Sequence, residues 1–186
     1  SMVMALAAAI ETKDAYTHGH SKKVMEYAVK VAKELQLSEE EVETIKYAGL
    51  LHDIGKIGVK DVILRKDGPI TPEERVELNN HPQYGAFIME QVEFLRDVAP
   101  LTLYHHERYD GSGYPLGMKG EKIPLGARIL AVADTFDSMI ADRPYRKAFP
   151  YEHVVREMKK VSGTQLDPQI VDVFLSILKR ERKGKE

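Results

Sequence analysis

The 186-residue sequence contains no cysteine. This absence excludes disulfide bonds, thiolate nucleophiles and zinc sites built on sulfur, so any bound metal ion must be held by nitrogen and oxygen atoms. The absence also fits a reducing compartment, and we expect a cytoplasmic protein. The net charge of −2 gives no electrostatic reason to expect DNA, RNA or a membrane surface as a partner.

Long hydrophobic runs are also absent. The apolar stretch at residues 2–10 is far shorter than the roughly 20 residues that span a bilayer. No basic residue precedes it, so it makes a poor signal peptide. We expect it to form the first turns of a helix with one buried face, either a linker helix or the start of the domain. Ser1 before Met2 is typical of a residue left by an expression tag.

The composition is that of a globular protein with a sizeable core. Hydrophobic residues make up 43% and charged residues 30% of the chain, and its length fits one domain over residues 1–186. Apolar residues recur at helical spacing, for example Val24, Ala28, Val31 and Leu35. The predicted fold class is therefore all-α, a helical bundle with one long loop.

Capping signals divide the chain into helices. Ser38 and Glu41 form a capping-box pattern that opens a helix predicted to run to about Ile54, with Gly55 as its stop. Thr71, Pro72 and Glu74 open another, which must break near His81 because Pro82 disfavours helical geometry in the residue before it. A short strand is possible only in KIGVKDVIL, residues 56–64, and the Gly/Pro-rich segment 107–124 is predicted to be a long loop. Further helices are expected at about 96–105 and 125–141, and from Pro150 and Asp167-Pro168.

Histidines gather at the ends of these predicted helices, whereas scattered surface histidines would show no such relation. Each one alone is weak evidence, since a single histidine is more often a core or surface residue than a ligand. Helix ends that converge within a bundle would bring them together. As a set they offer the ligands that divalent iron, manganese, zinc or nickel accept without sulfur. The set comprises His20, His52, Asp53, His81, His105, His106 and Asp134.

Two carboxylates belong to this set. Asp134 interrupts an otherwise apolar helix, where a carboxylate is costly unless it is paired or bound to a metal. Asp53 directly follows His52, so that one helix end serves two ions. Five imidazoles and two carboxylates exceed what one ion uses, whereas two ions about 3.5–4 Å apart use all seven. The resulting positive site suits an anionic phosphodiester, with a metal-bound hydroxide as the nucleophile.

Several motifs resemble one family. HDIGKIG (52–58), HHERYDGSGYP (105–115) and ILAVADTFDSMIADRPYR (129–146) look like motifs of the HD-GYP family, a subgroup of the HD-domain metal-dependent phosphohydrolases. DAYTHGHS (14–21) and ILRKDGPITPEERVELNNHPQYG (63–85) also resemble it, and all stand in the family's order. The resemblance covers about residues 11–175.

The resemblance implies hydrolysis of the bacterial second messenger cyclic di-GMP to pGpG, and often onward to GMP. It implies two divalent ions, with Fe or Mn favoured and Ni or Zn as alternatives, held by the seven residues above with Asp53 as the bridging carboxylate. Lys56 matches a lysine that meets a substrate phosphate. Arg143 and Arg146 match basic positions that face the phosphates or guanines. Tyr114 is assigned either to packing under a guanine or to contact with partner signalling domains.

The Gly111–Pro115 loop is expected to have mainly a conformational role, because its glycines allow backbone angles that other residues avoid. One position departs from some family members, in which a glutamate four residues before the first ligand histidine helps to hold a third metal. Here that position is Tyr16, so the sequence predicts the two-metal form. Asp14 lies six residues before His20, so it does not align with the glutamate of the three-metal members. We expect Asp14 to have a structural role near a helix start.

Two other functions remain open at this point. The first is another HD-type phosphohydrolase that acts on a mononucleotide or on guanosine tetraphosphate, which the GYP loop disfavours. The second is a non-catalytic signalling module that binds a cyclic dinucleotide or a protein partner, which the complete ligand set disfavours. Catalytic domains of this family usually follow a sensor or receiver domain, and such a domain is an expected partner.

Overall fold

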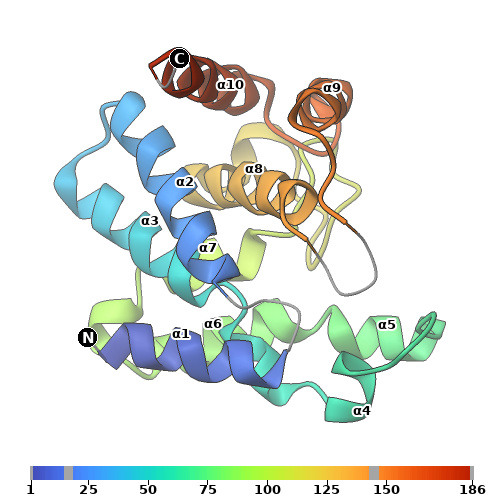
Figure 1. The fold of residues 1–186 in the computed structure, drawn as a ribbon. Coiled ribbons are helices and arrows are strands. Elements are labelled where there is room, and N and C mark those ends of the chain that lie inside the picture. Colours follow the sequence, from blue (N-terminus) through green and yellow to red (C-terminus); the bar gives the residue numbers. More distant parts are fainter. Residues whose placement is uncertain (1, 15–18, 143–146, 185–186) are drawn as a thin grey trace.

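The computed structural model describes residues 2–14, 19–142 and 147–184. Within these ranges the chain is helical and forms no named strand, which confirms the all-α prediction (Figure 1). None of the helices in the described ranges is both long enough and apolar enough to cross a membrane. The α-helices are α1 (Met2–Lys13), α2 (His20–Glu34), α3 (Glu39–Leu51), α4 (Asp61–Leu64), α5 (Pro72–Leu78), α6 (His81–Glu90), α7 (Ala99–Tyr104), α8 (Leu125–Ile140), α9 (Tyr151–Val161) and α10 (Pro168–Lys183).

The helices form two groups (Figure 1). In the view of Figure 1, α2, α3, α8, α9 and α10 lie above, while α1, α4, α5 and α6 lie below. Within the upper group α2 packs against α3 and α8, and in the lower group α6 packs against the short 3-10 helix η1 (Ile54–Gly58). The chain passes from the upper to the lower group directly after α3, at His52 and Asp53.

The core of the upper group follows the predicted helical spacing. Val24, Ala28 and Val31 lie on the buried face of α2. Beside them, the rings of Tyr27, Phe136 and Phe174 meet edge to face with centroid separations of 5.0–5.6 Å. These contacts bind α2 and α8 to α10, and they fix α8, the helix that carries Asp134.

The predicted caps are present. Ser38 and Glu41 form a reciprocal capping box at the start of α3, and Thr71 and Glu74 form another at the start of α5. The side chain of Asp167 accepts hydrogen bonds from the first main-chain N–H groups of α10. Capping residues in the sequence therefore predicted correctly where these three helices begin.

Two predictions in the segment after α3 are wrong. The helix ends at Leu51 rather than near Ile54, and the possible strand in residues 56–64 is instead η1 followed by α4. Gly55 is not a helix stop but a point of close approach, because a Cβ there would lie 1.8 Å from the main-chain oxygen of His81. Tertiary contact with α6 therefore decides the conformation of this segment, which local propensity cannot reveal.

The predicted loop at 107–124 contains only one short 3-10 helix, η3 (Gly120–Lys122). Buried Glu107 organises it by accepting hydrogen bonds from the main-chain nitrogens of Leu116 at 2.7 Å and Met118 at 2.9 Å. Gly111 has a φ of 86°, and a Cβ at Gly113 would lie 2.3 Å from a main-chain nitrogen. Both glycines are thus required by the backbone, in agreement with the conformational role expected for this loop.

Candidate metal centre

The seven residues proposed as ligands lie together in the structure, in two adjacent groups. The four-residue cluster consists of Asp53, His81, His105 and His106, and the three-residue cluster of His20, His52 and Asp134. Within each cluster the potential ligand atoms all lie within 4.8 Å of one another. The neighbouring residues His52 and Asp53 fall into different clusters, which is the arrangement expected if one helix end serves two ions.

Three of the histidines are oriented in the same way. The Nδ1 atoms of His52, His81 and His105 donate hydrogen bonds to the carbonyl oxygen three residues earlier, at 2.9, 2.7 and 2.6 Å. A carbonyl oxygen only accepts, so Nδ1 carries the proton in each ring and Nε2 of the neutral ring keeps its lone pair. All three residues follow the last turn of a helix, where carbonyl groups have no intrahelical partner.

The Nε2 atoms of these three rings are buried and have no hydrogen-bond partner among the described residues. Buried polar atoms without partners are rare, because each loses its hydration without compensation. The nearest carboxylate oxygen to Nε2 of His81 belongs to Asp53 and lies 3.4 Å away. Three lone pairs that converge without donors match what a divalent metal ion requires, so the residues present fit a metal centre with nitrogen and oxygen ligands.

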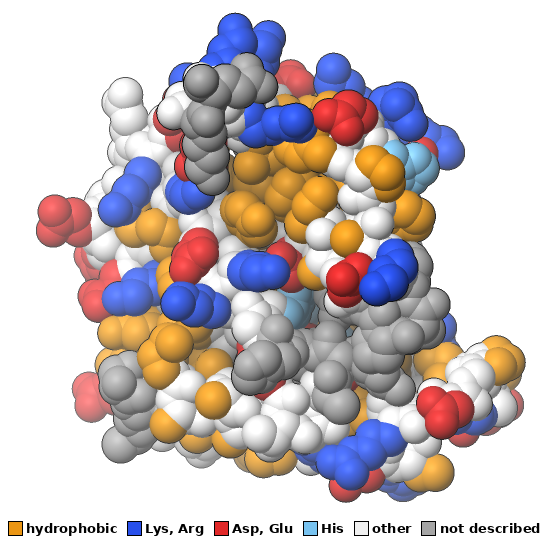
Figure 2. Space-filling view, in the orientation of Figure 1, with side chains coloured by type: hydrophobic (Ala, Val, Ile, Leu, Met, Phe, Trp, Pro, Cys, Tyr) orange, Lys and Arg blue, Asp and Glu red, His pale blue; other side chains and the backbone are white. Residues whose placement is uncertain are grey.

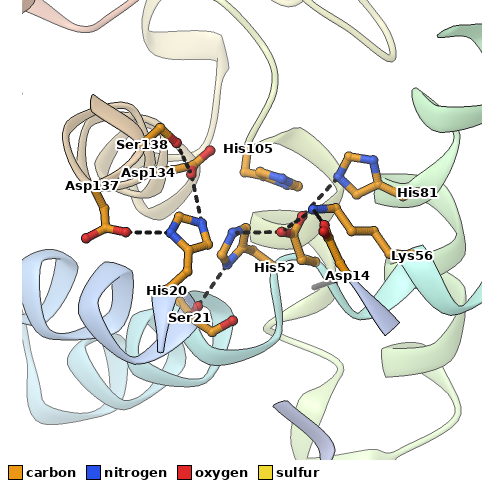
Figure 3. A network of polar contacts seen from close by, with 12 residues as sticks. Asp14, His20, Ser21, His52, Lys56, His81, His105, Asp134, Asp137 and Ser138 are labelled. Carbon is orange, nitrogen blue, oxygen red and sulfur yellow. Dashed lines mark hydrogen bonds and ion pairs between the residues drawn. The ribbon is translucent and has the colours of Figure 1, made fainter. Parts of the chain in front are cut away.

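His20 is held differently, by two carboxylates of α8 (Figure 3). Its Nδ1 lies 2.7 Å from Oδ2 of Asp137, and its Nε2 lies 3.1 Å from Oδ1 of Asp134. Burial alone would lower the pKa of His20, but hydrogen bonds to these two carboxylates outweigh it and raise the pKa to about 9. Likewise, burial would raise the pKa of Asp134, yet His20 holds it well below the usual value.

Asp53 faces both clusters. Its Oδ2 lies 3.6 Å from Nε2 of His52 in the three-residue cluster, and its Oδ1 faces Nε2 of His81 in the four-residue cluster. Burial alone would raise the pKa of this carboxyl, but the Lys56 ammonium and the histidines hold it well below the usual range. Asp53 is therefore ionised and stands where a carboxylate shared by two ions would stand.

Lys56 lies beside this carboxylate. Its Nζ is 2.8 Å from Oδ2 of Asp53 and 2.7 Å from Oδ2 of Asp14 (Figure 3). Burial would lower the pKa of Lys56, but the two carboxylates outweigh it and raise the pKa above the usual value. Asp14 follows the end of α1, rather than starting a helix, and anchors this lysine. The ammonium group is thus fixed at the edge of the candidate metal centre.

Tyr114 packs against a member of the four-residue cluster. Its ring stacks on His106 with a centroid separation of 5.1 Å and an interplanar angle of 27°. His106 in turn lies against His105 at 3.9 Å between centroids. Burial lowers the pKa of His106 to about 3 and that of His105 well below its usual value, so both rings are neutral and able to act as ligands.

A cleft of about 640 Å³ opens beside the centre. Atoms of a histidine are visible near the middle of the face drawn in Figure 2. One wall of the cleft carries the candidate ligands together with Lys56 and Tyr114, and the opposite wall comes from α4, α5 and their connection. Its volume lies within the range of small-molecule sites in proteins, which is about 300–1,000 Å³.

Three residues singled out in the sequence, Tyr16, Arg143 and Arg146, lie outside the described residues. The sequence reasoning missed Asp137, which is buried and orients His20. Its signal was present, since Asp137 lies three residues after Asp134 in the same apolar helix and therefore on the same face. No local sequence pattern predicts the contact between Lys56 and Asp14, because the two residues are 42 positions apart in the chain.

Comparisons with known proteins show the family to which the chain belongs. The sequence profile of the HD domain family matches residues 4–170. A cyclic di-GMP phosphodiesterase from Thermotoga maritima is 42% identical over 171 residues, which are 91% of this chain and 46% of that protein. A 3'3'-cGAMP-specific phosphodiesterase from Vibrio cholerae is 36% identical over 168 residues, which are 90% of this chain and 36% of that protein. The chain thus spans less than half the length of these curated relatives.

The fold also matches a solved structure. A crystal structure of a cyclic GMP-AMP specific phosphodiesterase from V. cholerae aligns with a TM-score of 0.78 and 22% identity, covering 97% of this chain and 49% of that one. At this level of identity the match shows the fold alone, and it agrees with the helical architecture described above.

Proposed function

The chain belongs to the HD domain family, and on that premise we propose that it is a metal-dependent phosphodiesterase acting on a cyclic dinucleotide, with cyclic di-GMP as the substrate. The recognition of this family from the HD doublet and the GYP motif is confirmed by the profile match and by the curated relatives. The substrate, the products pGpG and GMP, and the roles of individual residues belong to the proposal.

One observation carries the proposal. Three buried Nε2 atoms, on His52, His81 and His105, have no hydrogen-bond partner among the described residues, and their rings are fixed by main-chain carbonyl groups. A purely structural histidine in such a position would satisfy both ring nitrogens. An arrangement that leaves three lone pairs directed at one region supports the use of all seven residues as metal ligands.

Bound divalent ions would supply Lewis acidity that offsets the phosphate charge and activates water for attack on phosphorus. The chain itself contributes the orientation of the ligands. Main-chain carbonyl groups fix the rings of His52, His81 and His105, and the carboxylate of Asp137 fixes His20. Two ionised carboxylates, Asp53 and Asp134, leave the loaded centre positive, which favours an anionic phosphodiester over a neutral ligand.

Lys56 is proposed to contact the phosphate. Its ammonium group stands at the edge of the cleft, 2.8 Å from the carboxylate shared between the clusters, and so can place a positive charge beside a phosphate oxygen. Asp14 holds the ammonium there by a second contact. Arg143, Arg146 and Tyr114 are proposed as further substrate contacts on the basis of the family resemblance.

The relatives support two related substrates. The T. maritima protein is named for cyclic di-GMP, whereas the V. cholerae protein is named for 3'3'-cGAMP, and identity is higher to the former. Both molecules contain two phosphodiester bonds and at least one guanine. We therefore propose cyclic di-GMP as the substrate and 3'3'-cGAMP as the second candidate.

The test is direct. The protein is purified without oxygen and its metal content is measured. It is then incubated with cyclic di-GMP, 3'3'-cGAMP, guanosine tetraphosphate and GMP, and the products are separated by chromatography. We expect pGpG from cyclic di-GMP, abolished by a chelator and restored by Fe²⁺ or Mn²⁺. Metal-loaded protein that hydrolyses only guanosine tetraphosphate or a mononucleotide, or that binds cyclic di-GMP without cleaving it, would contradict the proposal.

A further inference from the structure

The wall of the cleft that faces the candidate metal centre includes α5, a helix that contributes no buried residue to the core. None of the residues of α5 is buried, although a reciprocal capping box at Thr71 fixes its start. Its last residue, Leu78, provides the carbonyl oxygen that accepts the hydrogen bond from Nδ1 of His81 at 2.7 Å. The helix is therefore held in register with the four-residue cluster, and its residues Arg75 and Leu78 line the cleft.

The basic residues that line the cleft differ in their partners. Lys56 is engaged by Asp53 and Asp14, and Lys66 lies 2.6 Å from a carboxylate oxygen of Glu74. Arg75 of α5 also lines the cleft, yet its guanidinium group has no ion pair and no hydrogen bond with any described residue. Of the described basic side chains in the cleft, Arg75 is thus the one whose charge is left for a ligand.

The surroundings of Arg75 fit a nucleobase rather than a bare anion. Leu64 and Ile70 add apolar surface to the same wall, and Asn79, one helical turn after Arg75, adds an amide. The side chain of Asn79 likewise has no hydrogen-bond partner among the described residues. Apolar side chains bordered by a guanidinium and an amide can accept the face of a purine and hydrogen-bond to its edge.

Resting on the proposed function, we infer that Arg75, supported by Asn79, binds the base of one nucleotide of the substrate and selects guanine over adenine. A guanidinium group donates two parallel hydrogen bonds to O6 and N7 of guanine. Adenine presents an amino group in place of O6, so one donor of Arg75 then meets another donor. Arg75 and Tyr114, the ring stacked on His106, line the same cleft.

The inference is tested on the metal-loaded protein with three compounds: cyclic di-GMP, cyclic di-AMP and bis(p-nitrophenyl) phosphate, which carries no base. Values of kcat/KM are measured where cleavage occurs. Dissociation constants of phosphorothioate analogues of the two cyclic dinucleotides are measured by calorimetry. Arg75→Ala is expected to weaken binding and cleavage of cyclic di-GMP about 10- to 100-fold, while values for the other two compounds change less than about twofold.

Two further variants sharpen the test. Arg75→Lys keeps the charge but not the fork of donors, so it is expected to retain little of the preference for guanine. Arg156→Ala serves as the matched control, because Arg156 lies exposed on α9 and does not line the cleft. We expect Arg156→Ala to leave kcat/KM and the dissociation constants unchanged for all three compounds.

The outcomes separate this inference from the proposed function. An equal loss for cyclic di-GMP and cyclic di-AMP in Arg75→Ala, largely recovered in Arg75→Lys, would mean that Arg75 binds a phosphate and would overturn base recognition. Unchanged affinity in Arg75→Ala would overturn it as well, while cyclic di-GMP cleavage by the unmodified protein still supported the proposed function. An unmodified protein that cleaves bis(p-nitrophenyl) phosphate but binds neither dinucleotide would overturn both.

Discussion

The two clusters of the candidate metal centre are built in different ways. In the four-residue cluster, His81 and His105 are oriented by main-chain carbonyl groups at the ends of α5 and α7. In the three-residue cluster, a main-chain carbonyl group also orients His52, but His20 is oriented by a side chain, the buried carboxylate of Asp137. A carbonyl anchor persists through any substitution that keeps the helix, whereas a carboxylate anchor depends on one residue. The three-residue cluster is therefore the more sensitive to mutation of residues that are not themselves ligands.

The largest effect is expected where the clusters meet. Asp53→Ala removes the carboxylate that faces histidines of both clusters, so we expect loss of bound metal and at least a roughly 10³-fold fall in turnover. Metal content by mass spectrometry and kcat measure the two effects. Asp172→Ala, an exposed carboxylate on α10, is the control. An Asp53→Ala protein that keeps its metal and full activity would rule out the ligand assignment.

Asp137→Asn tests the difference between the two anchors. The substitution keeps an acceptor for Nδ1 of His20 but removes the charge, and its amide nitrogen replaces a carboxylate oxygen in a buried position. We expect metal affinity of the three-residue cluster to fall about 10- to 100-fold, with the four-residue cluster unchanged. A competitive metal titration with two resolved steps measures this. Equal weakening of both steps would show that the clusters do not differ as described.

Lys56→Met separates substrate contact from metal binding. The substitution leaves Asp53 without its cation, so we expect the metal-free protein to lose about 3 kcal/mol of unfolding free energy in urea. Bound metal ions replace that positive charge, and metal content is expected to stay intact while turnover slows. Loss of metal from this variant would give Lys56 a structural role in the centre in place of a role towards phosphate.

The smallest effect on metal binding is expected from loss of the N-terminal cap of α5, the helix whose last carbonyl group orients His81. Thr71→Ala removes the cap of α5, a helix of 7 residues with no buried side chain. We expect fraying that disturbs the Leu78 carbonyl and weakens metal binding through His81 by a few-fold, at a cost of about 1 kcal/mol or less in stability. The same titration and thermal unfolding measure the two quantities.

Ser38→Ala is the matched control for the cap of α5. It removes an equivalent capping box from α3, a helix of 13 residues with a buried face, which carries His52 at its end. Packing holds the distant end of α3, so we expect a loss of about 1 kcal/mol in stability and no change in metal affinity. An effect of Ser38→Ala on metal binding as large as that of Thr71→Ala would contradict this account.

The sequence by itself determined the fold class, the helix starts and the set of candidate ligands. Helical spacing in α2, the capping boxes at Ser38 and Thr71, and histidines at helix ends are local patterns, and local patterns are readable from one chain. The long loop was also predictable, because glycine and proline disfavour regular helices irrespective of their tertiary surroundings.

Tertiary structure alone decided three other features. It placed η1 where an extension of α3 or a strand was expected, because Gly55 lies against the main chain of His81. It joined Lys56 to Asp14, a contact between residues far apart in the chain. It also turned Arg75 of α5 towards the cleft that holds the candidate ligands. Such contacts arise from the packing of distant segments, and nothing in the spacing of residues within one segment encodes them.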